Sequence, residues 1–174
     1  MRYEKSGITG KIVERELFGE SRYEQITGER SPEFKYREPD QAFRLVKEMQ
    51  PFDPTRPIPE FAYMVRRIIF KELKLSLEAQ LRFYTSVESS LDRYRGIDGW
   101  FEIDNEDEEI RVTVDITKNT DAKDTGYKAN IVFLVPDDGL DRKVDREQFI
   151  KYSLELAHEV VELFRQQGLS PERN

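Results

Sequence analysis

The stretch IDGWFEIDNEDEEIRVTVDIT, residues 97–117, decides the fold, because apolar and polar side chains alternate along both of its halves. A period of two is typical of strands that bury one face. The polar residues between the halves suit a four-residue hairpin loop, which fixes the register of every later pair. Glu102 then lies opposite Arg111, and this opposite-charge pair supports the register. The stretch therefore predicts an antiparallel hairpin with one apolar and one polar face.

The same register places Asp98 opposite Asp115 on the polar face of the hairpin. Directly opposed residues have Cβ atoms about 4.5–5.5 Å apart, so two carboxylates there repel each other unless a cation or a shared proton compensates. Mg²⁺ or Mn²⁺ would provide this compensation, because hard cations favour oxygen ligands. The alternative is a frayed hairpin end at which both aspartates are solvated.

Four helices and one further strand are expected around the hairpin. Apolar residues at helical spacing predict helices over residues 39–50, 60–73, 76–91 and 146–167, and the apolar run ANIVFLV (129–135) predicts a strand that completes a three-stranded meander. Residues 1–38 are charged and show no sustained period, so we expect a polar N-terminal extension that contains at most a short strand or a docking arm. Residues 39–174 are then one α+β domain, with a small mixed sheet flanked by helices.

Composition limits the classes of function. The chain has 174 residues, with 28 basic and 35 acidic side chains and a net charge of −7, which argues against broad tracking of nucleic-acid phosphates. It contains no cysteine, so disulfides, thiolate metal sites and cysteine nucleophiles are excluded. No apolar run approaches the roughly 20 residues of a membrane-spanning helix, and the first residues do not form a signal peptide. We therefore expect a cytoplasmic protein.

Two motifs around the paired aspartates resemble a known family. The run DRYRGIDG (92–99), followed after the hairpin turn by VTVDITK (112–118), resembles motifs of the PD-(D/E)XK nuclease superfamily. The resemblance covers residues 76–166 and implies a restriction-endonuclease-like fold. It also implies one or two Mg²⁺ or Mn²⁺ ions, held by Asp98 and Asp115, that activate water to hydrolyse phosphodiester bonds in DNA. Many such nucleases that cut both strands act as dimers, so a homodimer would fit this resemblance.

The family lysine is missing from its usual place. It follows the second acid by two residues, and this chain has Thr117 there. Lys118 is one residue later and would point to the opposite face of a regular strand, unless a bulge or the strand end turns it inward. Lys128, at the start of the next strand, is the other candidate for the assisting cation.

The family also implies an acidic residue on a helix and a strand after the last helix. Glu88 falls on the inward stripe of the helix predicted over 76–91, so we favour it over Glu78, which lies in the first turn. The N-terminal segment could complete the sheet in place of the last strand. A second interpretation is a non-catalytic interaction or nucleic-acid-binding module that keeps this scaffold and has lost the metal chemistry.

Overall fold

The computed structural model describes residues 7–118 and 129–169. The helices are α1 (Gly7–Phe18), α2 (Tyr23–Thr27), α3 (Pro39–Lys47), α4 (Glu60–Glu72), α5 (Ser90–Arg95) and α6 (Arg146–Gln166), with a 3₁₀ turn, η1, at Glu78–Gln80. The strands are β1 (Leu81–Thr85), β2 (Gly99–Asn105), β3 (Glu108–Thr117) and β4 (Ile131–Leu134). None of the helices in the described part of the chain is long and apolar enough to span a membrane.

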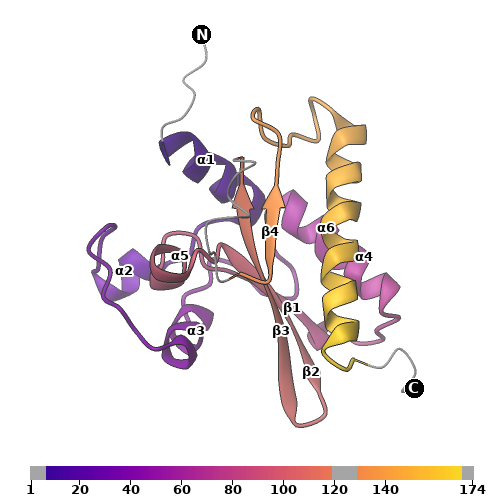
Figure 1. Ribbon diagram of the computed structural model, residues 1–174, viewed down its shortest axis with the longest axis horizontal. Coiled ribbons are helices and arrows are strands. Elements are labelled where there is room, and N and C mark those ends of the chain that lie inside the picture. Colours follow the sequence, from indigo (N-terminus) through magenta and orange to yellow (C-terminus); the bar gives the residue numbers. More distant parts are fainter. Residues whose placement is uncertain (1–6, 119–128, 170–174) are drawn as a thin grey trace.

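One mixed sheet, in the order β1-β2-β3-β4, lies at the centre of the molecule (Figure 1). β1, β2 and β3 form an antiparallel meander, and β4 joins β3 in parallel. Phe101 pairs with Val112 and Glu102 with Arg111, so the predicted register of the hairpin is confirmed. The prediction of an α+β fold with a small mixed sheet among helices is confirmed as well.

Two predictions about the sheet were wrong. The helix expected over residues 76–91 does not form, because this segment contains η1 and then β1. Phe83 and Tyr84 are adjacent and both buried, since each faces a different side of the sheet, and a strand buried on both sides lacks simple alternation. The expected meander of β2, β3 and β4 was also wrong, because β4 runs parallel to β3.

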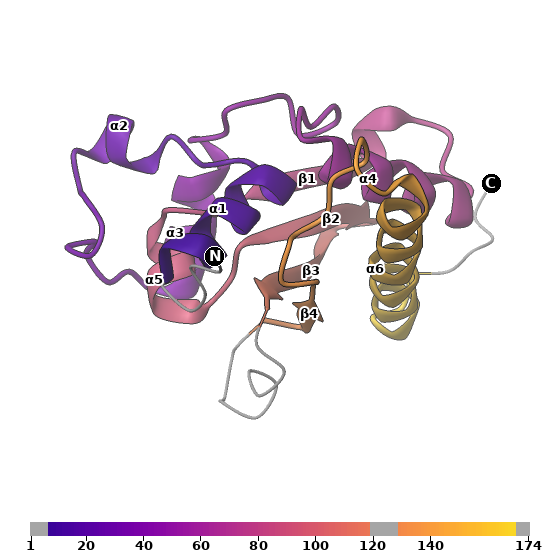
Figure 2. The ribbon, with the colours of Figure 1, turned by 90° about the horizontal axis from the view of Figure 1, so that it is seen from above.

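Helices cover both faces of the sheet (Figure 2). The first face carries Phe83, Phe101 and Val112 and packs with residues of α1, α4 and α6 in one hydrophobic cluster. The opposite face carries Tyr84 and Trp100 and packs with residues of α3 and α5 in a second cluster. Because the hairpin alternates, the acidic residues of its polar face lie on the same side as Trp100, the side that α3 and α5 cover.

The N-terminal segment contributes to the core, in contrast to the polar extension predicted for it. Val13, Leu17 and Phe18 of α1 are buried in the first hydrophobic cluster. Phe18 packs against the start of β2, where a Cβ atom added to Gly99 would lie 2.9 Å from Phe18 Cδ2 and 2.9 Å from the carbonyl oxygen of Tyr84. This glycine therefore permits a close approach of α1 to the residue that follows Asp98.

Two glycine substitutions test this packing. Gly99→Ala should lower the free energy of unfolding by about 1–3 kcal/mol, because the added methyl group meets a buried ring and a backbone oxygen. Gly10→Ala, inside α1 and with nothing within 4 Å of the added Cβ, should instead raise it by about 0.5–1 kcal/mol. Urea denaturation of both variants provides the measurement, and equal effects would contradict the close approach of α1 to β2.

Candidate metal centre

Asp98 and Asp115 are neighbours at the end of the hairpin. Asp98 directly precedes β2, and its N–H donates to the carbonyl oxygen of Val114 at 2.9 Å, which continues the β2–β3 ladder beyond Gly99. Its Oδ2 accepts a hydrogen bond of 2.8 Å from the N–H of Ile116. The two aspartates are 1% and 6% exposed, so they are not the solvated pair of a frayed hairpin end.

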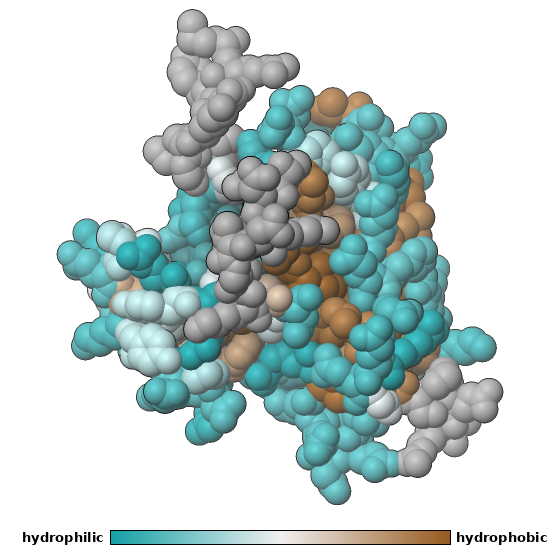
Figure 3. Space-filling view, viewed as in Figure 1, coloured by the Kyte–Doolittle hydropathy of each residue, from teal (hydrophilic) through white to brown (hydrophobic). Residues whose placement is uncertain are grey.

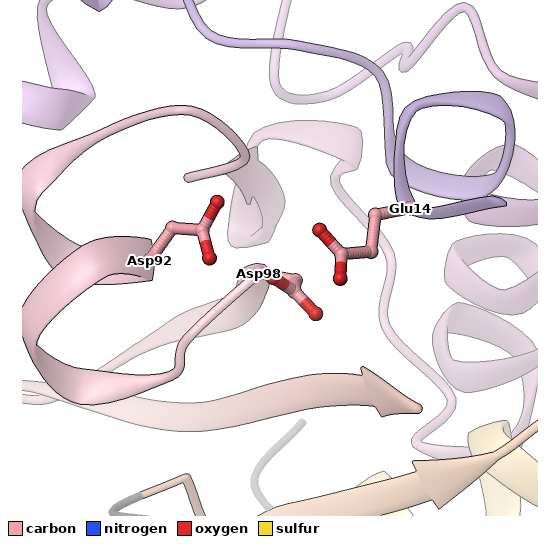
Figure 4. A group of neighbouring side chains, drawn as sticks. All are labelled: Glu14, Asp92 and Asp98. Atoms are coloured by element: carbon pink, nitrogen blue, oxygen red, sulfur yellow. The ribbon is translucent and has the colours of Figure 1, made fainter. Parts of the chain in front are cut away.

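Two further acids, from helices far apart in the sequence, converge on Asp98. Glu14 projects from α1 and Asp92 from α5, and carboxylate oxygens of Glu14, Asp92 and Asp98 all lie within 4.8 Å of one another (Figure 4). Asp92 belongs to the quoted motif, although no role was predicted for it. Glu14 gave no signal in the sequence, because only the tertiary packing of α1 brings it to the hairpin. We refer to Glu14, Asp92, Asp98 and Asp115 as the acidic cluster.

Lys11 is the cation that contacts this cluster. Its Nζ lies 2.5 Å from Asp92 Oδ2 and 3.0 Å from Glu14 Oε2. Burial alone would lower the pKa of Lys11, but Asp92 and Glu14 outweigh burial and raise this pKa above its usual value. Lys11 therefore stays protonated, and its ammonium group pairs with two of the four carboxyl groups of the acidic cluster.

The acidic cluster holds protons near neutral pH. Burial raises the pKa of Asp98 well above its usual value, and the charges of Glu14, Asp92 and Asp115 raise it further. Burial likewise raises the pKa of Glu14 to about 7 and that of Asp115 to about 6. Asp115 Oδ2 is buried and has no hydrogen-bond partner within residues 7–118 and 129–169. Among the residues that the structure describes, the cluster thus has fewer cations than carboxyl groups, and it contains an unused acceptor oxygen.

Glu102, on the same face of the same hairpin, shows the opposite situation. Its fully buried carboxylate lies 2.6 Å from Lys47 Nζ, 3.2 Å from Arg82 and 3.5 Å from Arg111. It also accepts a hydrogen bond of 3.2 Å from the indole of Trp100. Burial alone would raise the pKa of Glu102, but Lys47 and the other donors hold it below its usual value. The charge of Glu102 is therefore neutralised by neighbouring cations, whereas the charge of the acidic cluster is not.

The side chains of Lys118 and Glu88 have other partners than the acidic cluster. Lys118 Nζ donates to the carbonyl oxygen of Asp137 at 2.8 Å, and Lys128 lies outside the described residues. Glu88 lies in the turn before α5, because the predicted helix is absent, and its carboxylate pairs with Arg15 at 3.2 Å. Its N–H donates to Asp92 Oδ2 at 2.9 Å, so this turn helps to position Asp92.

Glu78, the less favoured alternative for the helical acid, is also engaged away from the cluster. Its carboxylate pairs with the buried Arg66 at 2.9 Å, beside η1. The carboxylates that lie within 4.8 Å of Asp98 are those of Glu14 and Asp92, and neither of the helical acids that the sequence suggested takes that place.

A groove on the surface of α4 and α6 is separate from the acidic cluster. This groove of about 400 Å³ runs between α4 and α6, where Met64, Ile68 and Leu154 line it, and none of its lining residues belongs to the cluster. Solvent reaches the cluster at Asp92 and Glu14, whose side chains are 11% and 14% exposed, and at Lys11, whose side chain is 34% exposed. A ligand would therefore approach the cluster beside Lys11.

Comparison of the chain with models of protein families, with curated proteins and with solved structures finds no match in any of the three. The chemistry of the site is therefore derived from its geometry and from the resemblance of its motifs.

The raised pKa values predict an unusual dependence of stability on pH. A carboxyl group whose pKa is higher in the folded state stabilises the fold below its unfolded pKa and loses this effect as the pH rises through the folded pKa. Without added metal, the free energy of unfolding should fall by roughly 2 kcal/mol from about pH 5 to about pH 8. Thermal denaturation across this range measures the change.

Replacing Glu14 and Asp115 by their amides should make this decrease smaller, because uncharged amides cannot lose the protons concerned. The matched control is Glu155→Gln with Glu162→Gln on the exposed side of α6, which should keep the wild-type slope. An unchanged slope in the Glu14 and Asp115 variant would refute the assignment of these protons.

Proposed function

We propose that this protein is a divalent-metal-dependent nuclease with a restriction-endonuclease-like fold that hydrolyses phosphodiester bonds in DNA, with its ions bound at the acidic cluster. The observation that carries the proposal is the convergence of the carboxylates of Glu14, Asp92 and Asp98, whose oxygens lie within 4.8 Å of one another. Lys11 pairs with two of them, and the buried Asp115 is the neighbour of Asp98 on β3. The unpartnered Oδ2 of Asp115 supports it independently, because a buried acceptor without a donor suits a cation.

The donor atoms fit Mg²⁺ or Mn²⁺. All of them are carboxylate oxygens, the ligands that hard cations prefer. Asp98 and Asp115 would be the ligands from the hairpin, and Glu14 would take the role that the motif resemblance assigns to an acid on a helix. A divalent cation would replace the protons that Asp98 and Glu14 retain near neutral pH and would balance the charge of Asp115, and so would supply the missing positive charge.

The chemistry follows from this arrangement. A bound divalent ion lowers the pKa of a coordinated water and offsets the charge that develops on the phosphate. Lys11 cannot act as a base near neutral pH, because its pKa is raised. Its ammonium group instead stabilises negative charge on the phosphate, the role that the resemblance gives to Lys118 or Lys128.

The second candidate function is a non-catalytic module on the same scaffold. It is favoured by one observation: Lys11 already pairs with Asp92 and Glu14, so retained protons and one ammonium group can keep the site stable without a metal. The two candidates differ in whether a divalent cation binds with useful affinity and whether DNA is cut.

Isothermal titration with Mn²⁺, followed by a plasmid-nicking assay, tests the nuclease proposal. The wild-type protein should bind Mn²⁺ and nick DNA, and the double variant Asp98→Asn, Asp115→Asn should lose both, because it removes two ligands without changing side-chain size. The control Glu155→Gln, Glu162→Gln removes two exposed acids on α6 and should retain both activities.

Metal binding without nicking in the wild-type protein would favour the non-catalytic module. No Mn²⁺ binding by the wild-type protein would refute the metal centre itself. Retention of binding by the double variant would place the metal outside the acidic cluster.

Lys11→Met tests the assignment of the assisting cation. It keeps an unbranched side chain and removes the charge, so nicking should fall by about 100-fold while Mn²⁺ binding persists. Lys118→Met serves as the control and should retain wild-type nicking, because Lys118 Nζ donates to the backbone of Asp137. The opposite result, with loss only in Lys118→Met, would return the role to the lysine that the sequence suggested.

A further inference from the structure

Two tyrosines remain at the surface beside α5, the helix that carries Asp92. Tyr36 and Tyr94 are 57% and 41% exposed, and their rings meet edge to face with centroids 5.5 Å apart. The guanidinium of Arg95 lies 5.8 Å from the centroid of Tyr36 and donates a hydrogen bond of 3.0 Å to its hydroxyl. The hydroxyl of Tyr94 donates to the carbonyl oxygen of Phe34. Both rings are therefore held in place while part of each stays open to solvent.

Unpaired cations accompany these rings. Lys35 and Arg93 are sequence neighbours of the two tyrosines, and neither they nor Arg95 form an ion pair with a carboxylate in the described part of the chain. Glu33 and Glu38 occur in the same segment, so the local charge is mixed. Stacking on the rings, more than attraction of phosphates, would thus provide the affinity of this surface. Weakly polar residues, pale in Figure 3, gather on this side over α2, α3 and α5.

The helix α5 connects this surface with the acidic cluster. Asp92 reaches from α5 toward Glu14 and Asp98 (Figure 4). Tyr94 is two residues further along the same helix and therefore projects about 200° away from Asp92. Tyr94 and Asp92 therefore lie on opposite sides of this short helix. A flexible strand could contact both by passing around this short helix.

We propose that Tyr36, Tyr94 and Arg95 form a stacking platform for an unpaired DNA strand, so that the substrate of the acidic cluster is single-stranded DNA or a single-stranded branch. Aromatic rings beside arginine bind single strands without sequence preference, because every base has a π face. Bases inside a duplex have both faces occupied and cannot stack on a protein ring. The net charge of −7 also disfavours duplex binding through phosphates alone.

Cleavage of this strand depends on the proposed nuclease function, whereas binding to the platform does not. The test therefore measures binding with the metal chelated by EDTA, using fluorescence anisotropy at low salt. The probes are a fluorescein-labelled oligothymidylate of about 15 nucleotides and a labelled duplex of the same length. The wild-type protein should bind the single strand more tightly than the duplex.

Three variants separate stacking from general effects. Tyr36→Ala with Tyr94→Ala should weaken binding of the oligothymidylate at least about tenfold, because two stacking rings are lost. Tyr94→Phe removes only the hydroxyl and should retain binding. The matched control is Tyr63→Ala on α4, since Tyr63 is 39% exposed and has Arg67 5.8 Å from its ring centroid, and it should bind like the wild type.

Circular dichroism melting of each variant identifies any loss of fold. Wild-type affinity in the double alanine variant, an equal loss in Tyr63→Ala, or equal binding of duplex and single strand would each overturn the platform. Failure of the nuclease proposal gives a different result, because Mn²⁺ binding or nicking would be absent while the oligothymidylate still binds. The two proposals can therefore fail separately.

Discussion

Phe18 of α1 packs on the backbone of β2 at Gly99, where no side chain separates the helix from the strand. Lys11, Glu14 and Phe18 are spaced by three and four residues, so they form one row along α1. When Phe18 is fixed against Gly99, the same row brings Glu14 and Lys11 to Asp98 and Asp92. The candidate metal centre thus depends on a hydrophobic contact one residue away from its most buried ligand.

Buried acidic side chains are stabilised in different ways at the two ends of the polar face of the hairpin. At Glu102, three cations and an indole surround one carboxylate, so its charge is stabilised inside the protein. At the acidic cluster, Lys11 pairs with two of the four carboxyl groups, and the pKa values of Asp98, Glu14 and Asp115 rise instead. If only stability mattered, we would expect neighbouring cations to neutralise the buried carboxylates at both ends of the polar face. Groups with perturbed pKa values at an otherwise well-satisfied sheet are typical of functional sites.

The sequence predicted the elements whose pattern is local. The hairpin register, α3, α4 and α6 follow from alternation, helical spacing and capping chemistry, and the structure contains them where expected. β1 was missed because Phe83 and Tyr84 are buried on opposite faces of the sheet, which erases the alternation. The direction of β4 and the burial of α1 depend on tertiary packing. For the same reason Asp98 and Asp115 could be paired from sequence, whereas Glu14 and Lys11 could not, and the restriction-endonuclease-like fold remains a prediction.

Lys11 has one role in the protein without metal and another in the proposed activity. Without a divalent cation, its ammonium group is bound by Asp92 and Glu14, which limits the repulsion among the four acids. A cation that shares these carboxylates weakens their hold on Lys11, because the same oxygens then interact with two positive centres. In the proposed reaction the lysine, which lies on the exposed side of the cluster, would then become available to a phosphate that approaches from the side of α5. The proposed tyrosine platform lies on the other side of this short helix and would deliver a strand from that direction. One substrate path would therefore account for the charge deficit of the cluster, the position of Lys11 and the exposed aromatic rings.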